Sequence, residues 1–216
     1  MRAATTSASP RERVLRTAYE LFSHHGVATI GVDRIVAEAG VAKMTLYRHF
    51  RSKDELVLAF LQERERRWTN EWLRAEAGRR GATAAERMLA IFEVFGEWFA
   101  REDFEGCSFI NVMLEVDDVQ NPVRQATVRH LEAIRGFVSG LAEEAGIQDP
   151  DGFARQWHIL MKGSIVSAAE GDLEAASRAK QMGGLLLAHH GVKAHRVSPT
   201  AATVPAPPST GRTAAP

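Results

Sequence analysis

The segment KMTLYRHF at positions 43–50 carries more hydrogen-bonding side chains than a helix needs for packing alone. Leu46 and Phe50 are four residues apart, so they would share one side of a short helix and could be buried there. The other positions present long donors and an aromatic ring, and they are Lys43, Thr45, Tyr47, Arg48 and His49. An α-helix fits the major groove of B-DNA, where such groups reach base edges and phosphates. The segment therefore predicts a helix that reads DNA.

A second short helix is predicted immediately before this segment. Its apolar positions are Val32, Ile35, Val36 and Ala39, and Gly40 follows them. A tight turn between the two helices needs a residue that can adopt a positive φ, and Gly40 meets that need. Two short helices joined in this way form a helix-turn-helix.

The polar helix is too short to be stable alone, so neighbouring helices must hold it in place. An earlier helix with one apolar face is predicted over about 10–25, and Gly26 ends it. We expect Leu46 and Phe50 to pack against this earlier helix and against Ile35.

The remainder of the chain also has the pattern of helices. Ser52 is suited to cap a helix, with Glu55 as its capping-box partner, and a long helix then runs into the 70s. Further helices are predicted at about 83–101, 105–117, 122–145, 150–170 and 172–190. We find no sustained apolar–polar alternation and no Asn-Gly or Asp-Gly hairpin, which are the usual signals of strands. The predicted fold is all-α, with a three-helix N-terminal helix-turn-helix domain and a larger C-terminal helical bundle.

These patterns divide the chain into four segments. Residues 1–9 are predicted to be disordered, residues 10–56 form the helix-turn-helix domain, and residues 57–192 form the larger helical domain. Residues 193–216 are a tail rich in Pro and Ala, which cannot bury enough apolar surface to fold and is predicted to be disordered.

Composition excludes several classes of protein. The chain has 216 residues, of which 45% are hydrophobic and 25% are charged, as in ordinary globular proteins. No apolar run approaches the ~18 residues of a transmembrane helix, so no membrane partner is expected. The segment MRAATTSASP at the start lacks the apolar core of a secretory signal. Cys107 is the only cysteine, which excludes an internal disulfide and favours a cytoplasmic location.

Charge is unevenly distributed, although 27 basic and 27 acidic residues give a net charge of zero. Residues 1–56 hold nine Lys or Arg and six Asp or Glu, whereas the rest of the chain holds 18 and 21. This modest asymmetry is the type expected when one end of a chain meets phosphates.

The stretch GVATIGVDRIVAEAGVAKMTLYRHFRSKDEL resembles the N-terminal domain of the TetR family of bacterial transcriptional regulators. The resemblance covers about 11–57 and lies in the run A-G-V-x-x-x-T-L-Y-x-H-F-x-x-K-x-x-L. Its matching residues are Ala39, Gly40, Val41, Thr45, Leu46, Tyr47, His49, Phe50, Lys53 and Leu56. So many fixed offsets make a specific signal, whereas the rest of the chain matches only in its length and all-helical layout.

The resemblance implies a homodimer that binds a palindromic operator in double-stranded DNA, with repression as the default. It also implies that a small hydrophobic molecule releases the operator when it fills the C-terminal domain, which would serve ligand binding and dimerisation. By position, the residues facing the operator are Lys43, Met44, Thr45, Tyr47, Arg48 and His49. Lys53 would clamp a phosphate at the start of the fourth helix.

The opening of the second helix departs from the family pattern. Many members have a pair of Thr or Ser residues there, whereas this chain has Ile30-Gly31-Val32. Gly31 is then expected to act as the N-cap, and Thr29 to take the phosphate contact.

Several of these residues have a structural alternative. Tyr47 could cover the helix pair, and His49 could cap a helix or enter the core. A purely structural role is hard to find for Lys43, because a positive charge at a helix start opposes the dipole. Met44 could touch a thymine methyl group. Three basic residues of the first helix are expected to be mainly solvated, with a phosphate contact as the alternative, namely Arg11, Arg13 and Arg16.

The C-terminal part contains an aromatic stripe that could line a ligand cavity. The candidates are Phe92, Phe95, Trp98, Phe99, Cys107, Phe109, Asn111, Met113, Trp157, His158 and Met161. A stripe of this kind is more often core than pocket, yet an apolar cavity with few polar anchors is also how small-molecule sites are built. Asn111 and His158 are the polar groups that we expect to point inward.

The last two predicted helices have the features of a dimer interface. Small residues let backbones approach closely, and leucines supply apolar surface that a monomer would struggle to hide. The candidates are Gly163, Ser164, Ser167, Ala168, Gly183, Gly184, Leu186 and Leu187. Two helices from each subunit would pack about a two-fold axis, which places the recognition helices about 34–36 Å apart or somewhat wider.

The sequence leaves two rival functions to compare with a ligand-responsive regulator. An enzyme would need a reactive group, but Cys107 has no nucleophile motif around it and lies in an apolar helical setting. The adjacent pairs His24-His25 and His189-His190 lack the i, i+4 spacing of a shared metal site. No catalytic residue, metal or cofactor is therefore predicted. The second rival is a DNA-binding protein of the same fold that no ligand switches, such as an architectural or division-site factor.

Overall fold

Helices make up all the regular structure between residues 8 and 192, the range described by our computed structural model. The predicted all-α class is confirmed. The predicted disordered ends fall almost entirely on residues 1–7 and 193–216, which lie outside the described range. The elements are α1 (Pro10–His25), α2 (Val32–Ala39), α3 (Lys43–His49), α4 (Lys53–Arg64), the π-helix η1 (Glu65–Leu73), α5 (Arg74–Arg80), α6 (Ala84–Phe99), α7 (Ser108–Glu115), α8 (Pro122–Glu144), α9 (Pro150–Ala169) and α10 (Ala175–His189).

The described residues cluster into two compact units. The first holds the chain up to Arg64 together with Ser108–Val128, and the second holds Glu65–Cys107 and the chain from Arg129 onwards. The first unit thus takes in more than the predicted helix-turn-helix domain, because α7 contacts α4 within it. Each unit is built around its own buried residues, and each is described separately below.

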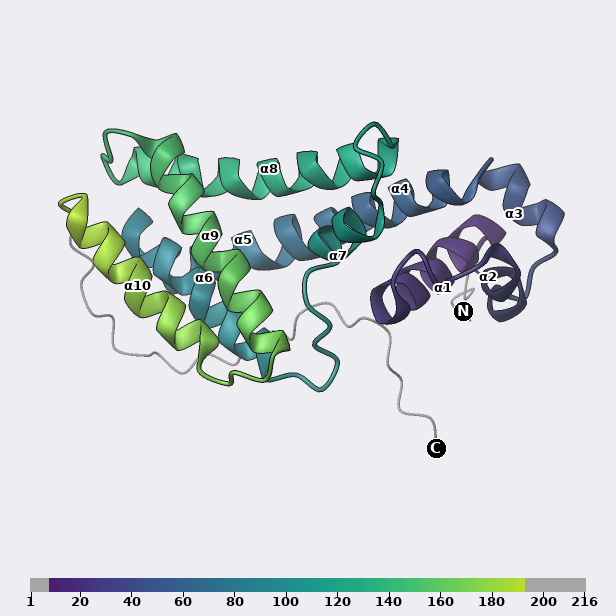
Figure 1. Cartoon of the computed structure of the whole chain (residues 1–216), viewed down its shortest axis with the longest axis horizontal. Coiled ribbons are helices and arrows are strands. Elements are labelled where there is room, and N and C mark those ends of the chain that lie inside the picture. Colours follow the sequence, from purple (N-terminus) through teal and green to yellow (C-terminus); the bar gives the residue numbers. More distant parts are fainter. Residues whose placement is uncertain (1–7, 193–216) are drawn as a thin grey trace, which may run out of the picture. The chain divides into compact units, whose positions relative to one another are not determined.

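In the first unit, α1 contacts α2, α3 and α4 (Figure 1). The start of α1 is a capping box, in which the Ser9 hydroxyl accepts a hydrogen bond from the Glu12 N–H and the Glu12 carboxylate accepts one from the Ser9 N–H at 2.7 Å. These bonds lower the pKa of Glu12. Phe60 of α4 meets the rings of Tyr19 and Phe22 edge-on, with centroids 5.4 and 5.6 Å away, so aromatic packing holds α1 on α4.

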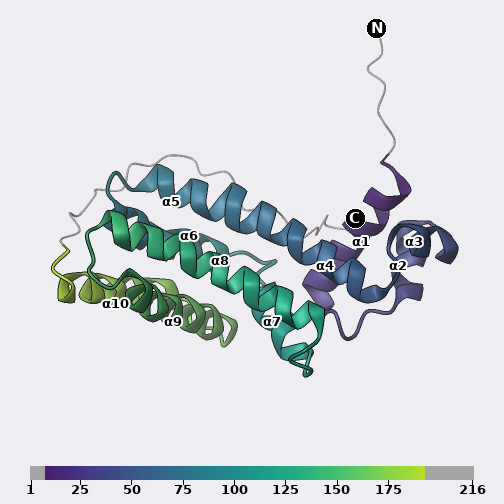
Figure 2. The same cartoon turned by 90° about the horizontal axis from the view of Figure 1, so that it is seen from above.

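In the second unit, α10 packs against α6 and α9, and Figure 2 shows α9 and α10 next to each other. The contact is centred on Trp157 of α9, which is fully buried. Its ring lies 5.2 Å from Phe92 of α6 and stacks at 5.4 Å on Phe153 of its own helix. Asp149 caps α9 by accepting a hydrogen bond from the Gly152 N–H, so the predicted start of this helix is confirmed.

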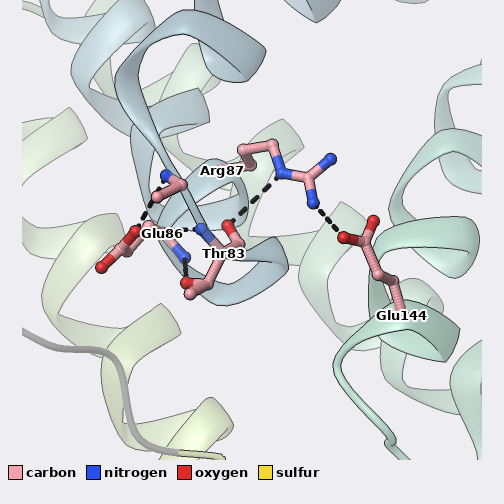
Figure 3. A network of polar contacts seen from close by, with 5 residues as sticks. Thr83, Glu86, Arg87 and Glu144 are labelled. Carbon is pink, nitrogen blue, oxygen red and sulfur yellow. Dashed lines mark hydrogen bonds and ion pairs between the residues drawn. The ribbon is translucent and has the colours of Figure 1, made fainter.

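A polar network fixes the start of α6 within the same unit (Figure 3). Thr83 and Glu86 form a second capping box, with bonds of 3.3 and 3.0 Å between side chain and backbone. Arg87 then donates to the Thr83 carbonyl oxygen and forms an ion pair with Glu144 at the end of α8. The loop before α6 is thereby tied to α8 through charged groups.

The long helix predicted after Ser52 is present, but its middle widens into the π-helix η1. This segment carries Trp68 and Trp72, whose ring centroids lie 4.7 Å apart. Trp68 also packs on Trp98 of α6 at 4.5 Å, and Trp98 meets Phe104 at 5.0 Å. The π-helix therefore contributes two indoles to a buried aromatic cluster of the second unit.

Gly183 of α10 allows the close approach of the helices around Trp157. A Cβ atom at Gly183 would lie 2.7 Å from the Trp157 ring and 3.1 Å from the Phe92 ring. We expect Gly183→Ala to lower the free energy of unfolding by roughly 1–3 kcal/mol, because two buried rings must shift, as measured by urea denaturation. Gly140→Ala on α8 is the control, since no other segment of the described chain lies within 4 Å of its Cβ position and Ala favours a helix. Equal destabilisation by both variants would contradict this packing.

Candidate nucleic-acid interface

The helix α3, which is predicted to read DNA, rests on two buried side chains. Leu46 is 0% and Phe50 is 1% exposed, and α3 contacts both α1 and α2, so the predicted packing side is confirmed. Ile35, the expected partner on α2, is also fully buried. The Arg11 guanidinium lies over the Phe50 ring at 5.1 Å, so this arginine helps to cover the base of the helix.

The turn between α2 and α3 has the geometry predicted for Gly40. Its φ of 62° and ψ of 42° are left-handed, and its N–H donates to the Ala37 carbonyl oxygen. The next N–H, that of Val41, donates to the Val36 carbonyl oxygen at 3.1 Å. Arg13 Nε adds a bond of 3.4 Å to the carbonyl oxygen of Ala39, so Arg13 supports the turn. The direction of α3 is therefore set by backbone and side-chain contacts together.

The side of α3 opposite Leu46 is open to solvent. Met44 is 75% exposed and Tyr47 is 39% exposed, and Lys43 and Arg48 are also exposed. Thr45 and His49 are half-buried, so all six predicted DNA-facing residues retain accessible surface. Arg48 and His49 also occupy the last turn of α3, where positive charge suits the helix dipole.

Lys43 forms an ion pair that sequence analysis did not anticipate. Its ammonium group lies 2.7 Å from Oδ1 of Asp33, in the first turn of α2. The hydrogen bond to Asp33 and the charge of that carboxylate raise the pKa of Lys43, with a smaller contribution from Tyr47. The two residues are ten positions apart, and only the geometry of the intervening turn brings them together.

The opening of α2 has no side-chain cap. Gly31 is the N-cap residue, as expected, with extended φ and ψ. The Thr29 hydroxyl donates instead to the His25 carbonyl oxygen at 2.5 Å. Because a hydroxyl has one proton to donate, Thr29 would have to give up this bond to donate to a phosphate.

A carboxylate from α7 anchors the loop between α1 and α2. The Ala28 N–H donates to Oε2 of Glu115 at 2.6 Å, and a Cβ atom at Gly26 would lie 2.6 Å from Oε1 of Glu115. Arg124 of α8 donates to the carbonyl oxygens at the end of α7, at 2.6 and 2.7 Å. The loop that leads into the helix-turn-helix is thus held by a segment 87 residues away in the chain.

A small cavity lies beside this anchor and is bordered by Lys53 of α4. Its volume is about 120 Å³, and its lining is Val27, Ala28, Lys53, Asp54, Val57, Glu115, Val116, Asn121 and Val123. Lys53, the predicted phosphate clamp, is half-buried at the first position of α4.

The predicted ligand-pocket residues fall in both units. Those buried in the second unit are Phe92, Phe95, Trp98, Trp157, His158 and Met161, whereas Phe99 and Cys107 are half-buried there. Phe109, Asn111 and Met113 belong to the first unit. Asn111 is exposed, which corrects the expectation that it points inward, because this position of α7 faces away from the buried Phe109 and Val112.

The buried polar groups of the second unit include His158 and two indoles. Burial lowers the pKa of His158 to about 4, and the charges of Lys162 and Arg135 act in the same direction. The indole N–H groups of Trp72 and Trp157 are buried and meet no acceptor within residues 8–192. Buried indoles usually find one, so these two could receive an acceptor from a ligand.

The predicted dimer residues divide between core and surface. Gly163 is exposed, and the half-buried residues are Ser167, Ala168, Gly184 and Leu186. Ser164, Gly183 and Leu187 are buried in the chain's own core, which corrects their assignment, because their side of each helix packs on neighbouring helices. Large exposed apolar residues lie on the same two helices, namely Ile159, Val166, Met182 and Leu185.

Two other kinds of feature are absent from the described part of the chain. No helix within residues 8–192 has the length and apolar character needed to cross a membrane. The described residues also contain no group of three or more His, Cys, Asp or Glu placed to hold a metal ion.

Comparison with known proteins agrees with this arrangement. The family model for bacterial regulatory proteins of the tetR family matches residues 14–60, and that for the tetracyclin repressor-like C-terminal domain matches residues 84–182. The transcriptional regulator AcuR of Cereibacter sphaeroides is 27% identical over 176 residues, which cover 77% of this chain and 80% of AcuR. The HTH-type transcriptional regulator YjdC of Escherichia coli is 22% identical over 175 residues, which cover 78% of this chain and 90% of YjdC.

A solved structure extends the likeness to both units. The crystal structure of a TetR-family transcriptional regulator from Streptomyces coelicolor superposes with a TM-score of 0.78 and 30% sequence identity. The superposition covers 87% of this chain and 92% of the other. With a DNA-reading helix-turn-helix at one end and matches along most of its length, the chain belongs to the TetR family of DNA-binding transcriptional regulators.

Proposed function

We propose that this protein represses transcription as a homodimer on a palindromic operator, and that a small hydrophobic ligand in the second unit releases it. The observation that carries the proposal is the exposed polar face of α3, set on the buried Leu46 and Phe50. A reading helix must be rigid before contact, because its side chains must meet base edges in one register. A dimer bound across a promoter then blocks polymerase without needing a contact surface for it.

Lys43 and Tyr47 are placed to make the main contacts, because both are exposed and lie one turn apart on α3. We expect Lys43→Ala and Tyr47→Ala each to weaken binding to the operator by roughly 1–3 kcal/mol, with the melting midpoint unchanged. The operator is first obtained by selection of bound duplexes from a random pool, and affinities are then measured by fluorescence anisotropy. A palindrome with half-sites about one helical turn apart is the expected product.

Arg129→Ala serves as the control for these variants, since Arg129 is exposed and belongs to the second unit. It should bind the selected duplex as tightly as the wild-type protein does. Wild-type affinity from folded Lys43→Ala and Tyr47→Ala would remove α3 from its proposed role.

The surface of α9 and α10 supports a homodimer. Ile159 and Leu185 are 63% and 73% exposed, on two helices that pack against each other. Apolar surface gathered in this way is typical of an interface. We expect the wild-type chain to sediment as a dimer at micromolar concentration, and Ile159→Glu and Leu185→Glu to shift it toward the monomer.

Val119→Glu is the matched control for the dimer, because Val119 is 61% exposed but lies in the first unit. That variant should remain dimeric. Sedimentation of the wild-type chain as a monomer at micromolar concentration would contradict the proposed assembly.

The aromatic cluster of the second unit supports a ligand that is mainly apolar and carries a hydrogen-bond acceptor. Trp72 and Trp157 offer free indole donors within buried aromatic surroundings. A ligand bound to the native state should raise the melting midpoint, and an inducing ligand should also weaken operator binding. A panel of hydrophobic compounds with and without a carbonyl group tests this by thermal melting and anisotropy.

Trp72→Phe removes one indole donor and keeps most of the ring volume. It should therefore reduce the rise in melting midpoint caused by carbonyl compounds more than the rise caused by hydrocarbons. A panel in which no compound changes either measurement would contradict the proposed release. The protein would then be a DNA-binding regulator that no ligand of this class switches.

A further inference from the structure

We infer that Asp33 is a specificity-determining residue of the DNA-binding face. Its ion pair with Lys43 lets Lys43 bond acceptors on base edges and weakens the contacts of Lys43 with phosphates. The inference rests on the proposed DNA-reading role of α3. Asp33 lies outside the set of residues predicted to contact DNA. It is an acidic side chain on a surface that approaches a polyanion.

The ion pair joins the two helices of the helix-turn-helix at their N-terminal ends. Asp33 is the second residue of α2, Lys43 is the first residue of α3, and the ammonium–carboxylate distance is 2.7 Å. The side chains of Asp33 and Lys43 are 81% and 53% exposed, so the pair lies at the surface. Its geometry follows from the left-handed turn at Gly40, which fixes where α3 begins relative to α2.

Stability gives little reason for this pair. A carboxylate in the first turn of α2 suits the helix dipole wherever its side chain points. An exposed ion pair of this kind contributes about 0–1 kcal/mol to folding. The neighbouring basic residue does not compete for the carboxylate, because Arg34 is paired with Glu38 at 2.8 Å. Asp33 is therefore committed to Lys43.

On DNA of random sequence, the pair reduces what Lys43 can contribute. Affinity for random DNA comes from basic side chains that neutralise phosphates and release counterions. Lys43 is already paired with Asp33, so a phosphate that accepts from a second hydrogen of the ammonium group gains little net attraction. That phosphate also lies close to the carboxylate, where like charges repel.

At a suitable base pair, the same ion pair can be kept. An ammonium group has three donor hydrogens, and one of them suffices for Asp33. The other two can bond O6 and N7 of a guanine, which are uncharged acceptors in the major groove. Lys43 then gains base contacts without losing its partner. The pair thus increases the difference between operator and random DNA, which is what specificity measures.

Asp33→Asn tests the inference, with salt dependence as the main measurement. Affinities for the most enriched selected duplex and for a shuffled duplex of the same composition are measured over a range of salt concentrations. For the shuffled duplex, we expect binding to tighten about fivefold at 0.15 M salt and the slope of log K against log salt to steepen by about 1.8, the value for two added phosphate contacts, one from each protomer of the dimer. The selected duplex should gain less, so the ratio of the two affinities should fall.

Asp151→Asn is the matched control. Asp151 is the second residue of α9, and it forms an exposed ion pair with Arg155 at 2.9 Å in the second unit. The same substitution there makes the same change in net charge and in helix-start chemistry. It should leave the salt slope and the affinity ratio unchanged.

A double-mutant cycle with Lys43→Met shows whether Asp33 acts through Lys43. In the Lys43→Met background, Asp33→Asn should no longer steepen the salt slope. An unchanged affinity ratio in Asp33→Asn would overturn the inference, and so would a parallel loss of both affinities with a lowered melting midpoint. Asp33→Ser, another residue suited to a helix start, repeats the test if Asp33→Asn unfolds.

The wild-type protein separates this inference from the function on which it rests. A wild-type chain that binds selected and shuffled duplexes equally overturns the proposed function, and the inference with it. A wild-type chain that discriminates, beside an Asp33→Asn variant that discriminates equally well, overturns the inference alone.

Discussion

Burial of Leu46 and Phe50 beneath α3 is the constraint on which the DNA-binding face depends. A seven-residue helix has too few internal hydrogen bonds to persist in water, so its existence follows from what lies under it. With both side chains at or below 1% exposed, the helix cannot rotate without losing core contacts. The polar side chains on the opposite face inherit that fixed orientation, including the Lys43 that Asp33 holds.

Local chemistry made much of this unit predictable. Local patterns in the sequence were enough to predict three of its features, namely the left-handed Gly40, the Gly31 N-cap and the buried Leu46. Each depends on residues only a few positions apart. The π-helix of η1 was missed, because its buried residues have the apolar spacing of an ordinary helix. Its contact with Trp98 of α6 is tertiary packing, which periodicity does not report.

Contacts across long sequence separations were also out of reach. Nothing near Glu115 marks it as the acceptor for the Ala28 N–H, and Asp33 reads as an ordinary helix-start carboxylate until the turn brings Lys43 beside it. The two small residues Gly183 and Gly184 look equivalent in the sequence, yet the first is enclosed by Trp157 and the second has no atom within 4 Å of its Cβ position. Which side of a helix faces the core is a property of the folded chain.

The anchor between Glu115 and the loop after α1 bears on how this regulator can be divided. A fragment that stops at Arg64 would contain the whole helix-turn-helix and the family signature, but would leave the Ala28 amide and the side chains around Val27 without their covering from α7. A chimaera that joins this helix-turn-helix to a foreign ligand-binding domain should therefore carry two separate segments of this chain. One is the N-terminal segment up to Arg64, and the other is residues 108–128.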